Sequence, residues 1–281
     1  METYVAGRHQ NSGGRSRVSA DRYLVRSVER ALAVLALFVE GDGRLTLAEI
    51  SAKVGLPQST VFRLLTTLEA SGFIERPIEG GRYQLGLRSL ALGSAFLRHN
   101  DLLGCANRFL VSLRDACGET IHIGVLEGAD VVYLDKLPGL HPIGLMSSRV
   151  GSRAPAYCTG LGKAMLAYRS EDAVRALFGG TRLTRFTDNT ITDLNQLLSA
   201  FDKIRRLGYA IDDGEHEDGV ACVAAAVFDS HGVAAAISAS GPADRIREQL
   251  LKADLVTALL EAARGVSSHL GAGIPGRLYP D

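Results

Sequence analysis

The chain has 281 residues, of which 46% are hydrophobic and 22% charged, and its 31 basic and 31 acidic side chains cancel. This length can bury the cores of two modest domains, and the composition is that of a globular protein rather than a disordered one. No uninterrupted apolar run approaches the roughly 20 residues of a membrane-spanning helix, and the amino terminus lacks the apolar core of a signal peptide. We therefore expect a cytoplasmic protein without a membrane partner.

The charges are distributed unevenly along the chain. Residues 1–100 hold 13 basic and 9 acidic residues, a net charge of +4, and the rest holds 18 and 22, a net charge of −4. A basic N-terminal part agrees with a contact to nucleic acid. The 4 cysteines show no Cys-x-x-Cys or Cys/His ligand spacing, so we expect reduced thiols, no metal site and no cofactor.

The chain begins with a stretch that lacks apolar periodicity. Residues 1–20 are rich in Gly, Ser and Arg, which predicts a disordered arm whose arginines either touch phosphates or are merely solvated. Residues 26–40 have the apolar spacing of an amphipathic helix, and we expect Ser27 to cap it. Its core-facing side chains should cover two further helices: Val28, Leu32, Leu35 and Phe38.

Residues 45–74 predict two short helices joined by a tight turn. Apolar side chains recur at helical spacing, at Leu47, Ile50 and Val54 and then at Val61, Leu64, Leu65 and Leu68. Gly55 can adopt the positive φ that ends the first helix, and Pro57 suits the start of the second. The side chains off the second stripe are mostly short and hydrogen-bonding: Gln58, Ser59, Thr60, Arg63, Thr66 and Thr67. Such a face suits DNA phosphates and base edges, although an ordinary helix pair in a core has the same spacing.

The residues after the second helix predict a β-hairpin. Two short stretches flank Gly80 and Gly81, a turn signal, and Arg76 and Arg82 stand on either side of the tip. A helix pair followed by a hairpin with cations is the order of a winged helix-turn-helix, whose wing contacts the backbone or the minor groove. The predicted DNA-binding residues are Gln58, Ser59, Thr60, Arg63, Thr66, Arg76 and Arg82.

The remainder of the chain predicts an α+β domain. Residues 87–99 predict a linker helix whose Leu/Ala surface suits packing on another subunit, and residues 102–117 predict a second helix. Period-2 patterns predict strands at residues 121–127, 130–136, 141–147, 220–228 and 233–240. Further helices are expected from Thr159, over 171–178, over 193–207, and from Asp244 to about Leu270. The expected fold is a mixed sheet flanked by helices.

Three stretches of this second part carry groups that suit a ligand. Residues 159–163 begin a helix, and the first N–H groups and glycines suit a bound carboxylate as well as a tightly packed helix start. Residues 208–223 concentrate carboxylates, which also suits a solvated acidic loop. Ser238 and Ser240 lie two apart on a strand, so both hydroxyls share one face, either toward a ligand or as satisfied core serines.

The stretch LPQSTVFRLLTTLEASGFIE resembles the DNA-binding segment of the IclR family of bacterial transcription regulators. The three later stretches resemble the family's effector-domain motifs, and the resemblance covers about residues 24–270. It implies a GAF-like sensing fold with an effector pocket at Gly160, Leu161, Asp212, Cys222, Ser238 and Ser240. The segment between Cys222 and Ser238 is one residue shorter than in the family's namesake, which leaves the serine register open, and Leu161 stands where the namesake has alanine.

The patterns and the resemblance together predict a disordered arm over residues 1–20, a winged helix-turn-helix domain over 21–85, a linker helix over 86–100, an effector-binding domain over 101–270 and a flexible tail over 271–281. We expect a homodimer or dimer of dimers that binds double-stranded operator DNA. We expect it to repress a catabolic operon under the control of a small carboxylic acid. The alternatives are an activator, a ligand-free architectural DNA binder, and a hydrolytic enzyme using Cys222 with His216 and Asp212.

Overall fold

The computed structural model describes residues 23–39, 42–77, 81–140, 146–180, 182–252 and 254–272. Its contacts divide the chain into two compact units, residues 1–99 and residues 100–281. The arm expected at 1–20, most of the strand expected at 141–147, and the tail from residue 273 lie outside the described residues. None of the helices in the described ranges is both long and apolar enough to cross a bilayer.

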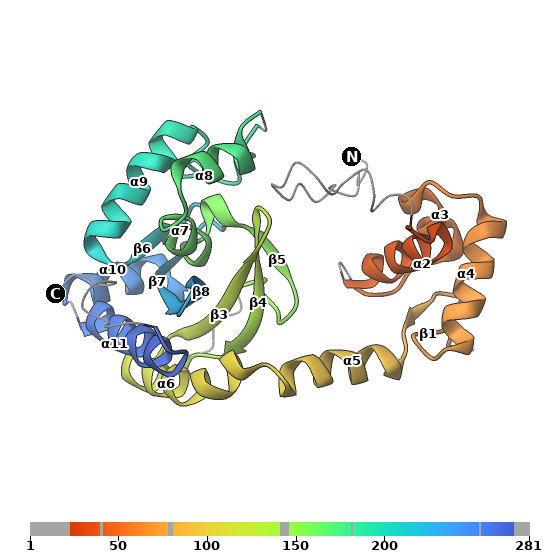
Figure 1. Ribbon diagram of the computed structural model, residues 1–281, viewed down its shortest axis with the longest axis horizontal. Helices are drawn as coiled ribbons and strands as arrows, with labels where there is room; N and C mark the ends of the chain where they lie inside the picture. Colours follow the sequence, from red (N-terminus) through yellow and green to blue (C-terminus); the bar gives the residue numbers. More distant parts are fainter. Residues whose placement is uncertain are drawn as a thin grey trace. The chain divides into compact units, whose positions relative to one another are not determined.

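The N-terminal unit contains the two predicted short helices, α3 (Leu47–Val54) and α4 (Gln58–Ala70) (Figure 1). A capping box begins α3, because the Thr46 side chain accepts from the Glu49 amide while the Glu49 carboxylate accepts from the Thr46 amide at 2.7 Å. Gly55 ends α3 with a φ of 65°, the left-handed conformation that glycine adopts most readily. The core of the unit consists of Val34, Phe38, Ile50, Val61, Leu65, Leu68, Ile74 and Tyr83.

The first helix of this unit, α2 (Arg26–Ala36), runs into a 3-10 turn, η1 (Leu37–Val39), and packs differently from our expectation. Val28 and Leu32, which we expected in the core, are 54% and 60% exposed, whereas Phe38 is buried and Leu35 packs on the core as expected, together with Val34. Val28 and Val34 lie on different sides of α2 because they are six positions apart on a helix with 3.6 residues per turn. The predicted N-cap was also wrong, since the helix begins after Val25 without a side-chain cap.

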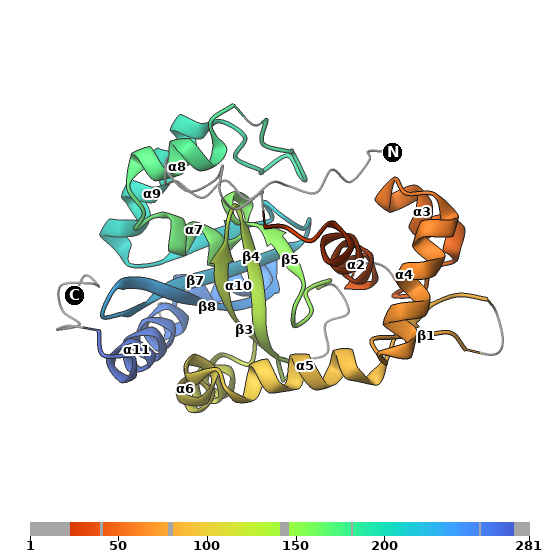
Figure 2. The same ribbon diagram turned by 45° about the vertical axis from the view of Figure 1, so that its right-hand side comes forward.

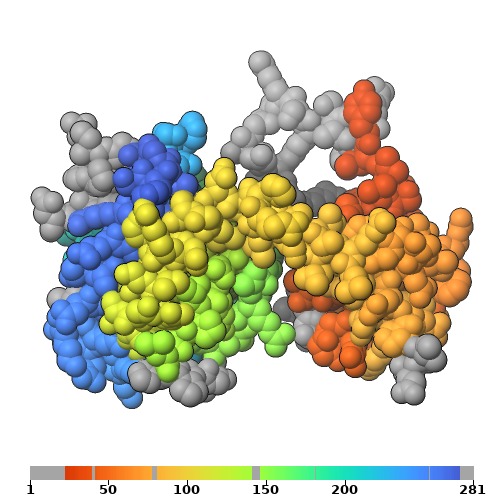
Figure 3. All heavy atoms as spheres, turned by 90° about the horizontal axis from the view of Figure 1, so that it is seen from below, coloured from red at the N-terminus to blue at the C-terminus, as the bar shows by residue number. Residues whose placement is uncertain are grey.

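The predicted hairpin follows α4. Strand β1 (Ile74–Glu75) pairs antiparallel with β2 (Gln84–Leu85), and a bridge from Leu45 to Tyr83 joins the hairpin to the chain before α3. Residues 78–80, which include part of the predicted tip, lie outside the described residues. Helix α5 (Leu87–Arg98) comes next and exposes a series of large apolar side chains: Leu87, Leu90, Leu92, Phe96 and Leu97. Figure 3 shows this helix in yellow on the molecular surface.

The second unit is built on one six-stranded sheet in the order β5-β4-β3-β8-β7-β6 (Figure 1). Its strands are β3 (Thr120–Glu127), β4 (Asp130–Leu137), β5 (Arg153–Pro155), β6 (Ala210–Asp213), β7 (Val220–Asp229) and β8 (Gly232–Pro242). The predicted α+β class is confirmed, but the predicted mixed sheet was wrong: every strand pair in the described residues is antiparallel. Tight turns connect β3 to β4 and β7 to β8, and strands joined in this way are antiparallel.

Helices cover both faces of this sheet (Figure 2). Helices α6 (Asp101–Cys117) and α11 (Asp254–His269) pack on one face. On the other face lie a 3-10 turn η2 (Ala156–Cys158), α7 (Gly160–Leu166), α8 (Glu171–Phe178) and α9 (Leu194–Leu207). Strand alternation creates the two cores, since Ile121 and Ile123 of β3 face α6 and α11 while His122 faces the opposite side.

The end of the chain departs from the predicted single helix between Asp244 and Leu270. Helix α10 (Ala243–Leu251) and helix α11 are separate elements, with Lys252 as the C-cap of the first. The apolar spacing continues through both helices, which is why the sequence suggested one helix.

Candidate functional site

The exposed face of α4 carries most of the predicted DNA-binding residues. Gln58, Ser59, Arg63 and Thr66 are exposed, while Thr60 is half-buried and Val61 is buried in the core. Arg63 makes no ion pair with any residue in the described ranges, so its guanidinium is available to a phosphate or a base edge. The helix therefore presents donors and acceptors outward and is fixed to the domain by its apolar stripe.

The two wing arginines differ in their surroundings. Arg82 donates to the Arg44 carbonyl at 3.0 Å and lies 3.7 Å from Glu49 and 4.0 Å from Asp42. These contacts tie the hairpin to the start of α3, and two carboxylates already compensate the charge that we expected to contact DNA. Arg76 is exposed, and its guanidinium stacks over the Tyr83 ring at 5.5 Å from the ring centroid.

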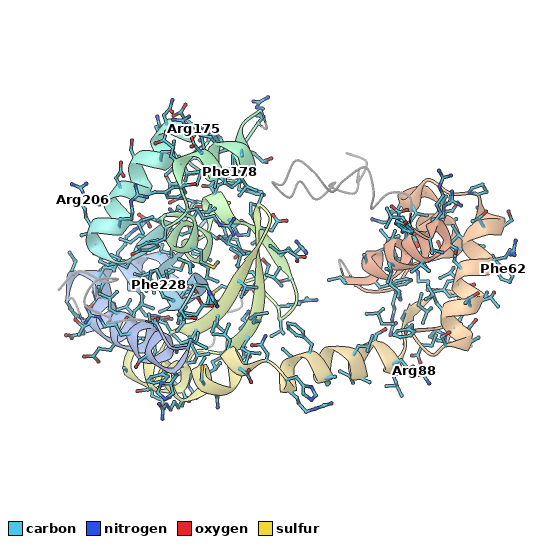
Figure 4. All side chains as sticks on the ribbon, viewed as in Figure 1. Phe62, Arg88, Arg175, Phe178, Arg206 and Phe228 are labelled. Atoms are coloured by element: carbon cyan, nitrogen blue, oxygen red, sulfur yellow. The ribbon has the colours of Figure 1, made fainter. Side chains whose placement is uncertain are left out.

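The sequence-based list omitted one exposed residue of the same helix, Phe62. Its side chain is 50% exposed, and Figure 4 shows it on the outer side of α4, away from α2 and α3. The sequence did contain a signal for the exposure of this residue, because position 62 lies off the apolar stripe of Val61, Leu65 and Leu68.

The second unit contains a cavity of about 140 Å³ between the sheet and the start of α7. All six residues that the family resemblance implied line this cavity: Gly160, Leu161, Asp212, Cys222, Ser238 and Ser240. Further lining residues that the sequence analysis missed include His122 and Tyr133. In the sequence, His122 stands between two isoleucines of an alternating strand, which places its side chain on the opposite face from theirs. This alternation does not reveal which strands lie beside β3.

Strand register explains why residues distant in sequence meet at the cavity. Asp212 is opposite Cys222, and Cys222 is opposite Ser240, so the three side chains form a row across β6, β7 and β8. Ser238 lies two residues from Ser240 and opposite His122, on the same face. The two serine hydroxyls are 3.5 Å apart. This pairing gives the serine register that the shorter segment had left open.

The start of α7 is packed tightly against β7. A Cβ atom on Gly160 would collide with the Cys222 sulfur, so only glycine fits at that position without a shift. The Gly162 amide donates to the Thr159 hydroxyl at 3.3 Å, and the Gly160 amide hydrogen-bonds to the Cys222 sulfur. These two amides, which we had expected to hold a carboxylate, therefore already have partners within the protein.

Lys163 lies in the same helix but does not line the cavity. Its ammonium group pairs with the Glu215 carboxylate and donates to the Ile211 carbonyl at 2.6 Å. Both side chains are buried, so each charge depends on the other for compensation. The pair fixes α7 against the loop after β6, and the lysine thus stabilises the cavity wall without facing the ligand space.

Burial sets the protonation states of the cavity. It raises the pKa of the Cys222 thiol to about 12, which keeps the thiol neutral at physiological pH, and it lowers the pKa of His122 to about 3, which keeps the imidazole uncharged. Burial also raises the pKa of Asp212 to about 7, against the opposing effects of Lys163 and of the Glu215 amide that donates to it at 2.8 Å. The cavity is thus polar with few fixed charges.

Two loops meet at the rim of the cavity. The Ser147 hydroxyl donates to the Glu217 carboxylate, and both residues line the cavity. The Ser148 hydroxyl lies 2.9 Å from His122 Nε2, and the Ser148 carbonyl accepts from Lys136 at 2.7 Å. In the described residues, no group of three or more His, Cys, Asp or Glu side chains is arranged to hold a metal ion. Asp212 and Glu217 of the acidic stretch line the cavity and form part of its polar wall.

The geometry gives little support to the hydrolytic alternative. A nucleophilic cysteine needs a thiolate, whereas burial raises the pKa of Cys222 to about 12. Among the hydrogen bonds of the described residues, none joins His216 to Cys222, and the His216 ring instead contacts Phe186 with centroids 5.3 Å apart. A base that is not in contact with the thiol cannot activate it in this arrangement.

Comparisons with known proteins agree with the two units. The family model of the IclR helix-turn-helix domain matches residues 27–77, and that of the bacterial transcriptional regulator IclR C-terminal matches residues 94–268. The HTH-type transcriptional regulator KdgR of Escherichia coli K12 is 35% identical over 248 residues, with 88% of this chain and 93% of the relative covered. The HTH-type transcriptional repressor AllR of the same organism is 33% identical, with 88% and 90% covered.

A solved structure is similar over almost its whole length. The crystal structure of an IclR homolog complexed with 4-hydroxybenzoate, from Microbacterium hydrocarbonoxydans, superposes with a TM-score of 0.76 at 26% sequence identity, with 87% of this chain and 98% of that chain covered. The matches span both the helix-turn-helix and the domain that contains the cavity. The chain therefore belongs to the IclR family of DNA-binding bacterial transcriptional regulators.

Proposed function

We propose that this regulator represses a catabolic operon, that α4 reads its operator, and that a small organic acid in the cavity modulates DNA binding. The observation that carries the proposal is the convergence of Asp212, Cys222 and Ser240 on the wall of one cavity, in a chain whose other unit presents a polar helix face. The name of AllR as a repressor supports repression rather than activation, and the 4-hydroxybenzoate in the Microbacterium homolog supports a small organic acid as the ligand.

On the DNA side, Gln58 and Arg63 suit direct reading of bases. A glutamine side chain can bind the major-groove edge of adenine and an arginine that of guanine, each through two hydrogen bonds. Gln58 is the first residue of α4, and in helix-turn-helix proteins the first residues of this helix contact the bases. Arg76 suits a backbone phosphate. Because of its contacts with Glu49 and Asp42, Arg82 positions the wing.

On the ligand side, the cavity suits an acid that also carries a hydroxyl group. The Ser238 and Ser240 hydroxyls can donate to a carboxylate, and Asp212 can accept from a ligand hydroxyl. A bound anion is tolerated beside Asp212 because burial raises the pKa of that carboxyl to about 7, so that it is not fully ionised at neutral pH. Leu161 narrows the cavity from the α7 side.

We further propose that the protein acts in the cytoplasm as a homodimer or dimer of dimers on an inverted repeat. One helix with few reading residues specifies too few base pairs for a genome, and a two-fold axis doubles the site. The exposed apolar side chains of α5 and of Val28 and Leu32 in α2 offer surfaces for a second copy. Analytical sedimentation with and without operator duplex measures the oligomeric state. Tight binding of a monomer to one half-site would contradict the proposal.

Calorimetry tests the ligand site. We expect 4-hydroxybenzoate or another small hydroxy acid to bind the wild type and to bind about 5- to 150-fold more weakly when both Ser238 and Ser240 are alanine, since each of the two lost hydrogen bonds typically contributes about 0.5–1.5 kcal/mol. Ser199→Ala, in the exposed part of α9, is the control and should bind as the wild type does. The same acids should change operator affinity about 5–150-fold, and operator should change acid affinity by the same factor. Equal affinity in the double variant and the wild type would remove the serines from the site.

A further inference from the structure

The exposed phenyl ring of Phe62 is the feature of α4 that the proposed polar contacts leave unexplained. The ring is 50% exposed in the middle of a helix whose apolar stripe, Val61, Leu65 and Leu68, is already buried. A single exposed apolar side chain is common on protein surfaces and carries no conclusion by itself. The residues next to it on the helix surface allow a conclusion about its role.

The ring is surrounded by the residues proposed to face DNA. Ser59 precedes Phe62 by three positions and Thr66 follows it by four, so both are its neighbours on the helix surface. The Thr66 hydroxyl donates to the Phe62 carbonyl at 2.9 Å, which removes that hydrogen from contacts outside the helix. The centre of the face is therefore partly apolar, with Arg63 beside it.

Base edges offer one apolar partner to such a ring. In the major groove, adenine, guanine and cytosine present only donors and acceptors, whereas thymine also presents its C5-methyl group. A phenyl ring cannot form the hydrogen bonds that the other edges require, and it would leave their polar atoms without partners. It gains free energy by removing a methyl group from water.

We propose that Phe62 is a specificity-determining residue that contacts the 5-methyl group of a thymine in each operator half-site. The inference rests on the proposed reading of DNA by α4, and it adds a base that the hydrogen-bonding residues do not read. The operator should accordingly hold a thymine at one fixed distance from its two-fold axis in both half-sites.

The test uses duplexes that the full-length wild-type chain selects from a random pool. Each thymine of the selected site is replaced in turn by deoxyuridine, which lacks only the methyl group, and affinity is measured at one fixed salt concentration. At one symmetric position, uracil should weaken binding about fourfold in one half-site and about 15-fold in both, the fold-change that corresponds to about 0.8 kcal/mol per buried methyl group. A 5-methylcytosine at that position should bind more tightly than cytosine, since it restores the methyl group.

The variants separate this reading from other roles of the ring. Phe62→Ala should bind the thymine and uracil duplexes equally, whereas Arg63→Ala should bind both more weakly and retain the fourfold difference. Affinity that is insensitive to uracil at every thymine, or an unchanged uracil effect in Phe62→Ala, overturns the proposal. Dissociation of Phe62→Ala into monomers at concentrations where the wild type is a dimer also overturns it, because the ring would then contact a second copy. If the wild type selects no common sequence, the proposed operator reading itself fails.

Discussion

Replacing Asp212 with asparagine should stabilise the protein by an amount that grows with pH. Burial raises the pKa of this carboxyl from 3.8 to about 7, so the folded state retains a proton that the unfolded chain releases. Because the folded state binds more protons between these two values, stability falls as pH rises through that window and the loss is complete above pH 7. At 1.36 kcal/mol per pKa unit the full loss is about 4 kcal/mol.

Asparagine has nearly the same shape, and its side-chain oxygen can still accept from the Glu215 amide, but it carries no charge. Urea unfolding followed by circular dichroism gives the stability difference between Asp212→Asn and the wild type at each pH. From pH 5 to pH 8 we expect this difference to increase by about 3 kcal/mol in favour of the variant. The effect of the depressed pKa of His122 is present in both proteins and cancels in the difference.

The matched control is Asp213→Asn, the next residue of β6, whose half-exposed side chain pairs with Arg247 at 2.8 Å. Its stability difference from the wild type should stay nearly constant over the same pH range. A constant difference for Asp212→Asn would refute the raised pKa. A difference that shrinks toward pH 8 would show that Lys163 stabilises the ionised carboxylate more than burial destabilises it.

Three further predictions concern α4 and α7. Arg63→Ala should weaken operator binding and leave thermal stability nearly unchanged. If the residue contacts a phosphate, the slope of log binding constant against log salt concentration should also become smaller by about one. Unaltered binding in a mobility-shift assay would show that α4 is not the recognition helix. Gly160→Ala should lower the free energy of unfolding in urea by about 1–3 kcal/mol, because its Cβ collides with the Cys222 sulfur. Adding Cys222→Ala should recover much of this stability, and no recovery would show that the collision is not the cause. Lys163→Met should cost about 3–5 kcal/mol because Glu215 stays buried without its partner, and a double variant with Glu215→Gln should be more stable than the single one. A double variant no more stable than the single one would argue against a buried carboxylate as the cause.

The helices of the N-terminal unit were the most predictable part of the fold. Leu47, Ile50 and Val54 repeat at helical spacing, and Gly55 and Pro57 mark where one helix ends and the next begins, so local sequence contains the information. The exposure of Val28 and Leu32 could not be predicted in the same way. Both belong to an apolar pattern, and which side of α2 is buried depends on where α3 and α4 pack.

The cavity shows the same division between local and non-local information. Ser238 and Ser240 could be assigned to one face because strand geometry has a period of two. Strand β6 was missed because Ala210–Asp213 is a short edge strand inside a run of carboxylates, which reads as a solvated loop. The place of His122 beside Ser240, at 3.4 Å, depends on the pairing of β3 with β8 across more than a hundred residues, and no local pattern encodes it.

The sheet that lines the cavity also separates two problems of protein design. Along β8, Ser238 and Ser240 face the cavity, while Ile237 and Ala239 are buried in the core beneath α6 and α11. Because successive side chains of a strand point to opposite faces, one residue can contact a ligand while the next packs in the core. A regulator for a new inducer could be sought by randomising only Ser238 and Ser240, because Ile237 and Ala239 keep their packing on the other side of the strand. A biosensor library built in this way would sample new chemistry with little loss of folded protein.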